Sequence, residues 1–196
     1  PHGSCRMPYH AVMTKRTVGS RTLALALLAA AVCLAPAARA DQPLTELDTW
    51  TGAIDFFSTG APLAIDGNDP DSTMVDTMAQ PATVSVNASE VPPAASLLAA
   101  YLYWGGSIVN DDCAGTTIDD TVDFTPPGGS SSILQADQCF CSDGGAGSYD
   151  VQMCRKDIAS LLGVMIGDYT VDGFDALIEN GATNNASFSV VLIYRE

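Results

Sequence analysis

Histidine is absent from most of this sequence. Its two histidines, His2 and His10, both lie near the start of the chain. Without a downstream imidazole, the rest of the chain cannot build a Ser-His-Asp or Cys-His catalytic arrangement, or a zinc site that uses histidine. Two kinds of chemistry stay open: a carboxylate pair, as in glycosidases, and a calcium site made of oxygen ligands. We therefore expect a protein that is not an enzyme.

Positive charge is also scarce. Of the 8 Lys and Arg residues, only Arg155, Lys156 and Arg195 lie after residue 40, whereas all 23 Asp and Glu residues do. Three positive against 23 negative side chains give a net charge of −20 from residue 41 onward. Nucleic acids and anionic membrane surfaces bind proteins through clustered Lys and Arg. The sequence therefore predicts no nucleic-acid partner.

The first 40 residues are not expected to belong to the folded protein. A basic segment that begins at Met13 precedes an apolar run over 23–38, and the small residues of Ala38-Arg39-Ala40 follow. This order is typical of a secretory signal peptide, here 13–40, with 1–12 as upstream read-through. The apolar run is shorter than the roughly 20 residues that span a bilayer. We expect a secreted or cell-surface protein with no membrane span in the mature chain.

Four cysteines remain after the predicted cleavage: Cys113, Cys139, Cys141 and Cys154. An even number in an exported chain predicts two disulfides. A bond between Cys139 and Cys141 is the least favoured pairing, because neighbours two apart on a strand point the same way. We expect Cys141 to pair with Cys154 around the SDGGAGS segment, and Cys113 with Cys139. A zinc site of four thiolates is less favoured, since the spacing lacks paired CxxC motifs.

Residues 41–196 are expected to form a single domain. Short apolar or alternating runs recur between turn segments such as DGNDPDS, VPPAA and TPPGGSS. Many short strands at this spacing predict an all-β fold, an antiparallel two-sheet β-sandwich of jelly-roll-like type. The main helical pattern is KDIASLLGVM, where apolar side chains recur on one face until Gly163. We expect one short helix there.

The segment 98–107, LAAYLYWGGS, contains the densest aromatic run. On a strand, Leu102 and Trp104 share one face, and Tyr101 and Tyr103 share the other. We expect a central strand that is buried on both sides, because large buried aromatics dominate protein cores. The alternative is that Tyr101, Tyr103 and Trp104 form a stacking platform that binds sugar rings.

The segment 187–195 alternates in the same way. Phe188 and Leu192 share one face of the predicted strand, and Val191 and Ile193 share the other. We expect this strand and the aromatic strand to form the middle of one sheet. Because such an apolar strand ends the sequence without a polar tail, we also expect the domain to be truncated at its C-terminus.

Two loops are rich in acidic residues. Asp66, Asn68, Asp69 and Asp71 fall within one turn, and further aspartates flank a second loop over 111–120. Calcium prefers several oxygen ligands at such spacings, so Asp66, Asn68, Asp69 and Asp71 are the candidate metal ligands. The favoured interpretation is that these residues only form turns, since the Asp-x-Asp-x-Asp-Gly order is missing. No cofactor is expected, and calcium is the metal that these oxygen ligands would suit.

Three motifs in order carry a resemblance to a known family. ASLLAAYLYWGGS, then RKDIASLLG with GDYTVDGF, then ASFSVVLIYRE resemble a secreted and surface module of bacteria classed as a domain of unknown function. The resemblance covers about residues 50 to 196. It implies a β-sandwich in an envelope or extracellular setting, and it brings no catalytic residues with it.

Two function classes follow. We expect a noncatalytic structural or adhesive module that is secreted or displayed at the cell surface, with other envelope or matrix components as partners. The alternative is a protein that binds glycans through its aromatics, or hydrolyses them with carboxylates, and that calcium could stabilise. The two classes differ in whether the aromatics are exposed and whether two carboxylates share a cleft.

Overall fold

The strand that carries the aromatic run lies at the centre of the fold. In a computed structural model, which describes residues 46–67, 75–108, 118–142, 150–178 and 184–196, β5 spans Ser96–Ile108 and β11 spans Ala186–Arg195. The two strands pair antiparallel, with Leu102 opposite Val190. One extra residue of β5 is accommodated between Ile193 and Tyr194 of β11 as a bulge. The prediction that these two strands form the middle of one sheet is confirmed.

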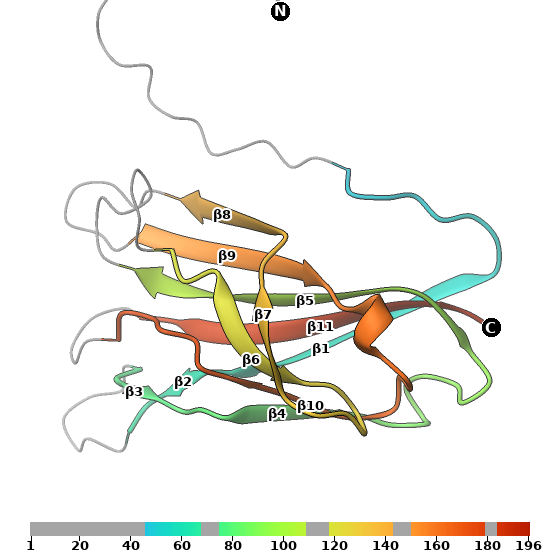
Figure 1. The fold of residues 1–196 in the computed structure, drawn as a ribbon, viewed down its shortest axis with the longest axis horizontal. Coiled ribbons are helices and arrows are strands. Elements are labelled where there is room, and N and C mark those ends of the chain that lie inside the picture. The colour runs from blue at the N-terminus through green and yellow to red at the C-terminus, as the bar shows by residue number, and fades with distance from the viewer. Residues whose placement is uncertain (1–45, 68–74, 109–117, 143–149, 179–183) are drawn as a thin grey trace, which may run out of the picture. The chain divides into compact units, whose positions relative to one another are not determined.

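Three further strands complete this first sheet (Figure 1). β1 (Ile54–Pro62) pairs with β11, β9 (Asp150–Asp157) pairs with β5, and β8 (Gln138–Ser142) pairs with β9. The order is β1-β11-β5-β9-β8, and every pair is antiparallel. β11 therefore has a neighbour on both edges.

The second sheet has four strands in the order β4-β10-β6-β7. They are β4 (Ala82–Val86), β10 (Gly167–Asp172), β6 (Thr121–Thr125) and β7 (Ser132–Gln135). A short ladder of β2 (Ala64–Ile65) and β3 (Thr77–Met78) lies beside the sandwich. All described strands belong to one compact unit, Gln42–Glu196.

The strand pairs are nested in the sequence, so that each pair lies between the two strands of the pair before it. With β8 and the β2–β3 ladder set aside, β1 pairs with β11, β4 with β10, β5 with β9, and β6 with β7. These pairs alternate between the two sheets, which is the connectivity of a jelly roll. The predicted antiparallel two-sheet sandwich of jelly-roll-like type is confirmed.

Alternating side chains of both sheets fill the space between them. Trp104, Leu102 and Phe188 come from the first sheet, and Phe124 and Tyr169 from the second. The rings of Phe124 and Tyr169 lie 6.4 Å apart, centroid to centroid. The Tyr169 hydroxyl donates to the carbonyl of Met165 at 2.7 Å, and burial raises the pKa of this phenol.

The predicted helix is present only as a single 3-10 turn, Ala159–Leu161. The segment begins inside a strand, because Lys156 and Asp157 still pair with β5 across the sheet. Ile158 then turns inward and is fully buried. Alternation therefore continues two residues further than the helical pattern suggested. Within the described residues, no helix is long and apolar enough to cross a membrane.

The structure corrects the predicted disulfide pairing. Cys139 bonds to Cys154, directly opposite it on the neighbouring strand with 4.0 Å between the Cα atoms. Cys141 is also disulfide-bonded, and Cys113 lies outside the described residues. The expected pairs, Cys141 with Cys154 and Cys113 with Cys139, are therefore wrong. The register places Cys141 opposite Gln152 instead.

Candidate functional site

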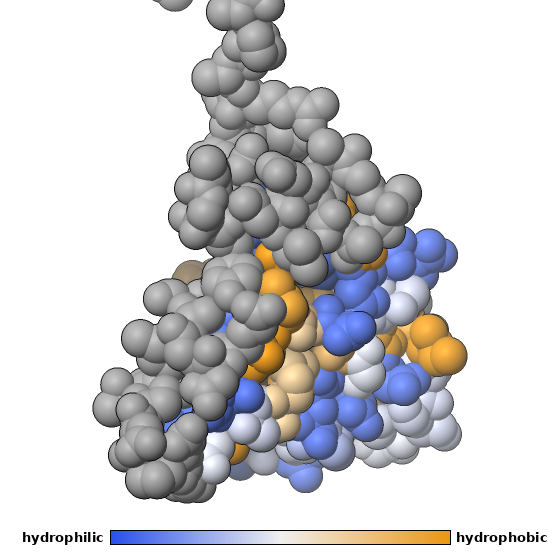
Figure 2. Space-filling view, turned by 90° about the vertical axis from the view of Figure 1, so that its left-hand side faces the viewer, coloured by the Kyte–Doolittle hydropathy of each residue, from blue (hydrophilic) through white to orange (hydrophobic). Residues whose placement is uncertain are grey.

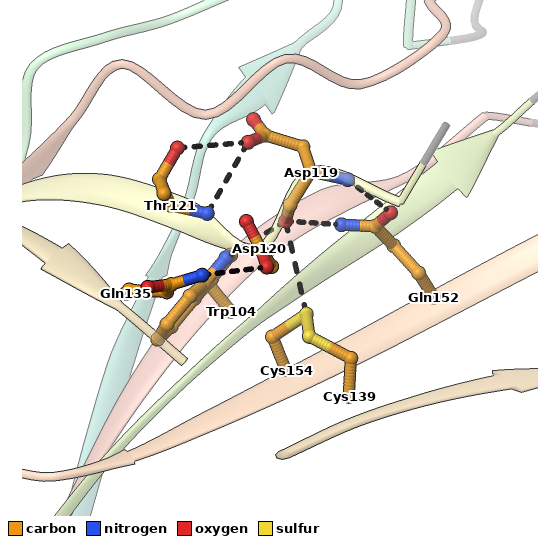
Figure 3. Close-up of a disulfide and its surroundings, with 8 residues drawn as sticks. All are labelled: Trp104, Asp119, Asp120, Thr121, Gln135, Cys139, Gln152 and Cys154. Atoms are coloured by element: carbon orange, nitrogen blue, oxygen red, sulfur yellow. Dashed lines mark hydrogen bonds between the residues drawn. A yellow bond between two sulfur atoms is a disulfide. The ribbon is translucent and has the colours of Figure 1, made fainter. Parts of the chain in front are cut away.

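The aromatic strand places its ligand candidates on two different faces. Trp104 points between the sheets and is fully buried, and its Nε1 donates to the carbonyl of Asp119 at 3.3 Å (Figure 3). Tyr101 and Tyr103 lie on the outer face of the first sheet, where Tyr101 is nearly covered and Tyr103 is half-buried. The expected core role fits Trp104. This residue shares no platform with the two tyrosines.

The two tyrosines meet an arginine from the next strand. Arg155 of β9 stands directly opposite Tyr103, and its guanidinium carbon lies 5.8 Å from the ring centroid of Tyr101. The tyrosine ring centroids are 6.5 Å apart. Burial, and then the carboxylates of Asp157 and Asp48, raise the pKa of Tyr101. The phenol of Tyr101 therefore stays neutral at physiological pH, and Arg155 contributes the positive charge here.

The outer face of the first sheet is rich in apolar side chains beyond this cluster. Phe56 on β1 is 69% exposed, and Met153 and Val151 on β9 are 42% and 39% exposed. Cross-strand pairing places half-buried residues of the same kind on the strands between them, Val191, Ile193 and Tyr103, and on β8, Phe140. We call this surface of β1, β11, β5, β9 and β8 the aromatic face. None of the described strands forms a third layer over it (Figure 1).

The outer face of the second sheet is built from different residues. Thr83 and Thr170 share a hydrogen bond between their hydroxyl oxygens at 2.8 Å, and the Ser85 hydroxyl donates to Asp168 at 2.5 Å. Alternation also directs Asp123 outward, between the buried Val122 and Phe124. We call this surface the threonine face. These hydroxyl and carboxylate groups bond to one another, as expected of a surface that faces water, and Ile133 of β7, opposite Asp123, is an exposed apolar side chain on the same face.

A shallow hollow beside the 3-10 turn contains two carboxylates. Asp137 and Asp157 both line it, together with Lys156 and Leu161. Asp137 accepts from Lys156 Nζ at 2.5 Å and from the Asp157 backbone at 2.7 Å, while Asp157 accepts from the Ala159 backbone at 2.9 Å. These bonds, the backbone bond first, lower the pKa of Asp137. A glycosidase acid needs a raised pKa, so Asp137 does not fit that role.

Asp119, from the second acidic loop, joins elements of the fold. Its carboxylate accepts from Thr121 and, at 2.6 Å, from the backbone of Asp175. Gln152 donates to its carbonyl at 2.8 Å and accepts from its N–H at 2.9 Å (Figure 3). The sulfur of Cys154 lies 3.7 Å from the same carbonyl, a packing contact because a disulfide sulfur carries no hydrogen. The buried amide of Gln152 therefore satisfies both the N–H and the carbonyl of Asp119, as a neighbouring backbone would.

The calcium prediction falls mostly outside the described residues. Asp66 is exposed, and Asn68, Asp69 and Asp71 lie outside the described residues. Within the described ranges, no group of three or more His, Cys, Asp or Glu side chains could hold a metal ion. The calcium site therefore stays a prediction.

One more hollow, of about 440 Å³, lies at the end of the sandwich between the Pro92–Leu97 and Leu162–Ile166 segments. Its side chains are apolar, with Val164 among the exposed ones. No charged or hydrogen-bonding side chain among the described residues lines it. Figure 2 shows one side of the molecule, where a strip of hydrophobic residues lies beside more polar ones.

Sequence reasoning found the two tyrosines and missed Arg155 and Gln138. The register places these two opposite each other, and the Arg155 Nη2 donates to Gln138 Oε1 at 3.4 Å. Neither residue belongs to a motif. The scarcity of positive charge was the signal that could have drawn attention to Arg155.

No family model, no curated protein and no solved structure matches this chain. The family resemblance therefore stays a prediction, and the function has to be argued from the geometry alone.

Proposed function

We propose that this protein is a noncatalytic extracytoplasmic module that attaches, through its aromatic face, to a component of the cell envelope or matrix. The Cys139–Cys154 disulfide supports an oxidising compartment. The signal-peptide pattern over 13–40 supports export.

One observation carries the proposal: the outer face of the first sheet presents large exposed apolar side chains on β1 and β9, with half-buried ones on the two strands between them. Phe56, Met153 and Val151 are each more than a third exposed. Contiguous exposed apolar surface on a soluble protein is typical of an interaction site. The threonine face shows that this sequence does build a polar outer face elsewhere.

The alternative function, glycan hydrolysis, has less support. Asp137 and Asp157 are both held by backbone hydrogen bonds, and the pKa of Asp137 is lowered where a general acid needs it raised. Glycan binding without hydrolysis remains compatible with the aromatic face, since Tyr103 is half-buried there.

The test is a retention experiment with the full chain. Wild-type protein and the double variant Phe56→Ser/Met153→Ser are mixed with envelopes of the organism that encodes the chain, and the fraction that sediments with them is measured. We expect the double variant to be retained much less. Its matched control is Ile133→Ser, which removes a 76% exposed side chain from β7 of the second sheet.

The control is expected to sediment like the wild type. Equal retention of all three proteins, or an equal loss in the control, would contradict attachment through the aromatic face. Melting temperatures measured in parallel show that each variant is folded.

A further inference from the structure

The positive charge of the folded part is concentrated on the aromatic face. Arg155 lies on β9, between the central strand β5 and the edge strand β8, and Arg195 ends β11 on the same side, opposite Ile54. Lys156, the third basic residue, points the other way and pairs with Asp137. The threonine face instead carries Asp123, Asp168 and Asp172 at outward positions. In a chain with so many acids, both arginines of residues 41–196 therefore lie on the aromatic face, beside Asp157.

Arg155 has no ion-pair partner among the described residues. The one ion pair there joins Lys156 and Asp137. Asp157, two residues along the same strand, uses its carboxylate to cap the 3-10 turn by accepting from Ala159. The Nε of Arg155 is buried without an acceptor, and its Nη2 makes only the long bond to Gln138. The structure therefore holds a guanidinium with unused donors against an aromatic ring.

The chemistry of this cluster selects its ligand. A guanidinium offers a planar pair of donors that matches a carboxylate. Because Nε is buried, a ligand meets the guanidinium at its Nη end. Tyr103, directly opposite, offers a partly exposed ring against which a sugar ring can stack. A sugar that carries a carboxylate would use both groups at once.

We propose that Arg155, with Tyr103 and Gln138, forms a binding site for a uronic acid residue of an acidic glycan. The carboxylate of the sugar accepts from the Nη end of Arg155, the ring lies on Tyr103, and Gln138 is close enough to bond a hydroxyl. This inference rests on the proposed function and names the ligand class of the same face.

The net negative charge of the protein does not prevent this binding. The aspartates of the threonine face belong to the other sheet, and two packed sheets lie about 10 Å apart. With side chains included, those charges are further from the ligand than the Debye length of about 8 Å at physiological salt. On the aromatic face itself, the carboxylate of Asp157 lies two residues along the strand and accepts from Ala159, so a ligand meets both this acid and the Nη donors of Arg155. A dense polyanion such as nucleic acid would still be repelled.

The direct test is calorimetric titration of the full chain with a galacturonic acid trimer. A neutral galactose trimer and a peptide of three glutamates are titrated alongside it. We expect binding of the uronate trimer only. Absence of its binding, equal binding of the neutral trimer, or binding of the peptide in place of the sugar would each overturn the inference.

Variants of the two arginines locate the site. Loss of a charged hydrogen-bonding partner lowers affinity by about tenfold or more, so we expect Arg155→Gln to bind the trimer at least that much more weakly. Arg155→Lys keeps the charge and loses the planar fork, so its affinity should fall between the two. Arg195→Gln is the matched control, since it removes the other arginine of the same face, and we expect unchanged affinity.

Equal affinity of wild type and Arg155→Gln would refute the site. If the trimer fails to bind while envelope retention still depends on Phe56 and Met153, the ligand class is wrong and the proposed function stands. If retention is also independent of these side chains, both fail.

Discussion

The two outer faces of this sandwich come from strands of similar alternation and yet differ in composition. On the threonine face, Thr83 bonds to Thr170 and Ser85 bonds to Asp168, so polar side chains satisfy one another across the strands. On the aromatic face, Phe56 and Met153 are exposed and have no such role. The comparison teaches that strand alternation alone does not decide what an outer face is for. The chemistry of its residues does.

The apolar composition of the aromatic face also carries a risk of association. An exposed apolar sheet surface favours association with other molecules. An outer face whose only requirement was contact with water would have polar residues like those of the threonine face. The aromatic face is therefore the part of the fold whose composition folding alone does not explain.

The largest expected effect is a difference in stability between substitutions on the inner and the outer side of β5. Trp104→Ala removes a fully buried side chain from between the sheets and should lower the free energy of unfolding by about 3–5 kcal/mol. Tyr103→Ala, one residue earlier on the outer side, should cost about 1 kcal/mol or less. Urea unfolding of both variants measures the difference. Similar losses would mean that the aromatic face is itself part of what keeps the sandwich folded.

The second expected effect concerns the edge strand that borders the aromatic face. The Cys139–Cys154 bond closes a segment of 15 residues and fastens β8 to β9. Loop-closure entropy for a segment of this length predicts a loss of about 3 kcal/mol in Cys139→Ser/Cys154→Ser. We expect urea denaturation to show this loss, and trimer binding to weaken as well because β8 carries Gln138. Full stability in the double variant would mean that the strand pairing alone holds β8.

A third effect lies at the rim of the first sheet, where Asp137 bonds Lys156 and the backbone of Asp157. The lowered pKa of Asp137 contributes stability above the unfolded value, and this contribution is lost as the pH falls through the folded pKa. The pair is partly exposed, so its contribution should be below about 1 kcal/mol.

Urea midpoints at pH 7 and pH 3 test this assignment. Asp137→Asn should be destabilised at pH 7 and should lose less stability than the wild type on acidification. Lys156→Gln keeps the backbone hydrogen bond, which is the larger cause of the shift, so its behaviour should be intermediate. An unchanged acid dependence in Asp137→Asn would show that other groups govern it.

The sequence was enough to predict the sandwich and the inner and outer sides of its central strands. Trp104 with Leu102 on one side, and Tyr101 with Tyr103 on the other, follow directly from a period of two. Alternation shows which side of a strand a residue lies on, but it does not show which residue stands opposite. Cys139 and Cys141 share one side of β8, so alternation could not decide which of them faces Cys154, and the disulfide prediction was wrong for this reason. The helix predicted from Lys156 onward is not formed at its start, because Lys156 and Asp157 pair with β5 and extend β9.

The candidate site was only half predictable. Tyr101 and Tyr103 stand in a visible motif, whereas Arg155 and Gln138 reach the site through the pairing of β9 with β5 and β8. Such cross-strand neighbours are distant in sequence and leave no local pattern. The unpaired state of Arg155 is also a property of the fold, since Lys156 beside it does form an ion pair.

The smallest expected effect on stability is also the most direct test of the comparison between faces. Thr83→Val/Thr170→Val gives the threonine face a β-branched apolar pair, and Val191→Thr makes the aromatic face more polar at its middle. Both sets lie on outer faces and keep a good strand residue, so unfolding free energies should change by only about 0.5 kcal/mol.

The measurement that distinguishes the two faces is envelope retention. Val191→Thr should reduce it, because Val191 lies beside Tyr101 in the register, whereas the threonine-face variant should be retained like the wild type. Increased retention of Thr83→Val/Thr170→Val would show that any exposed apolar pair promotes binding, and the aromatic face would then lose its special role.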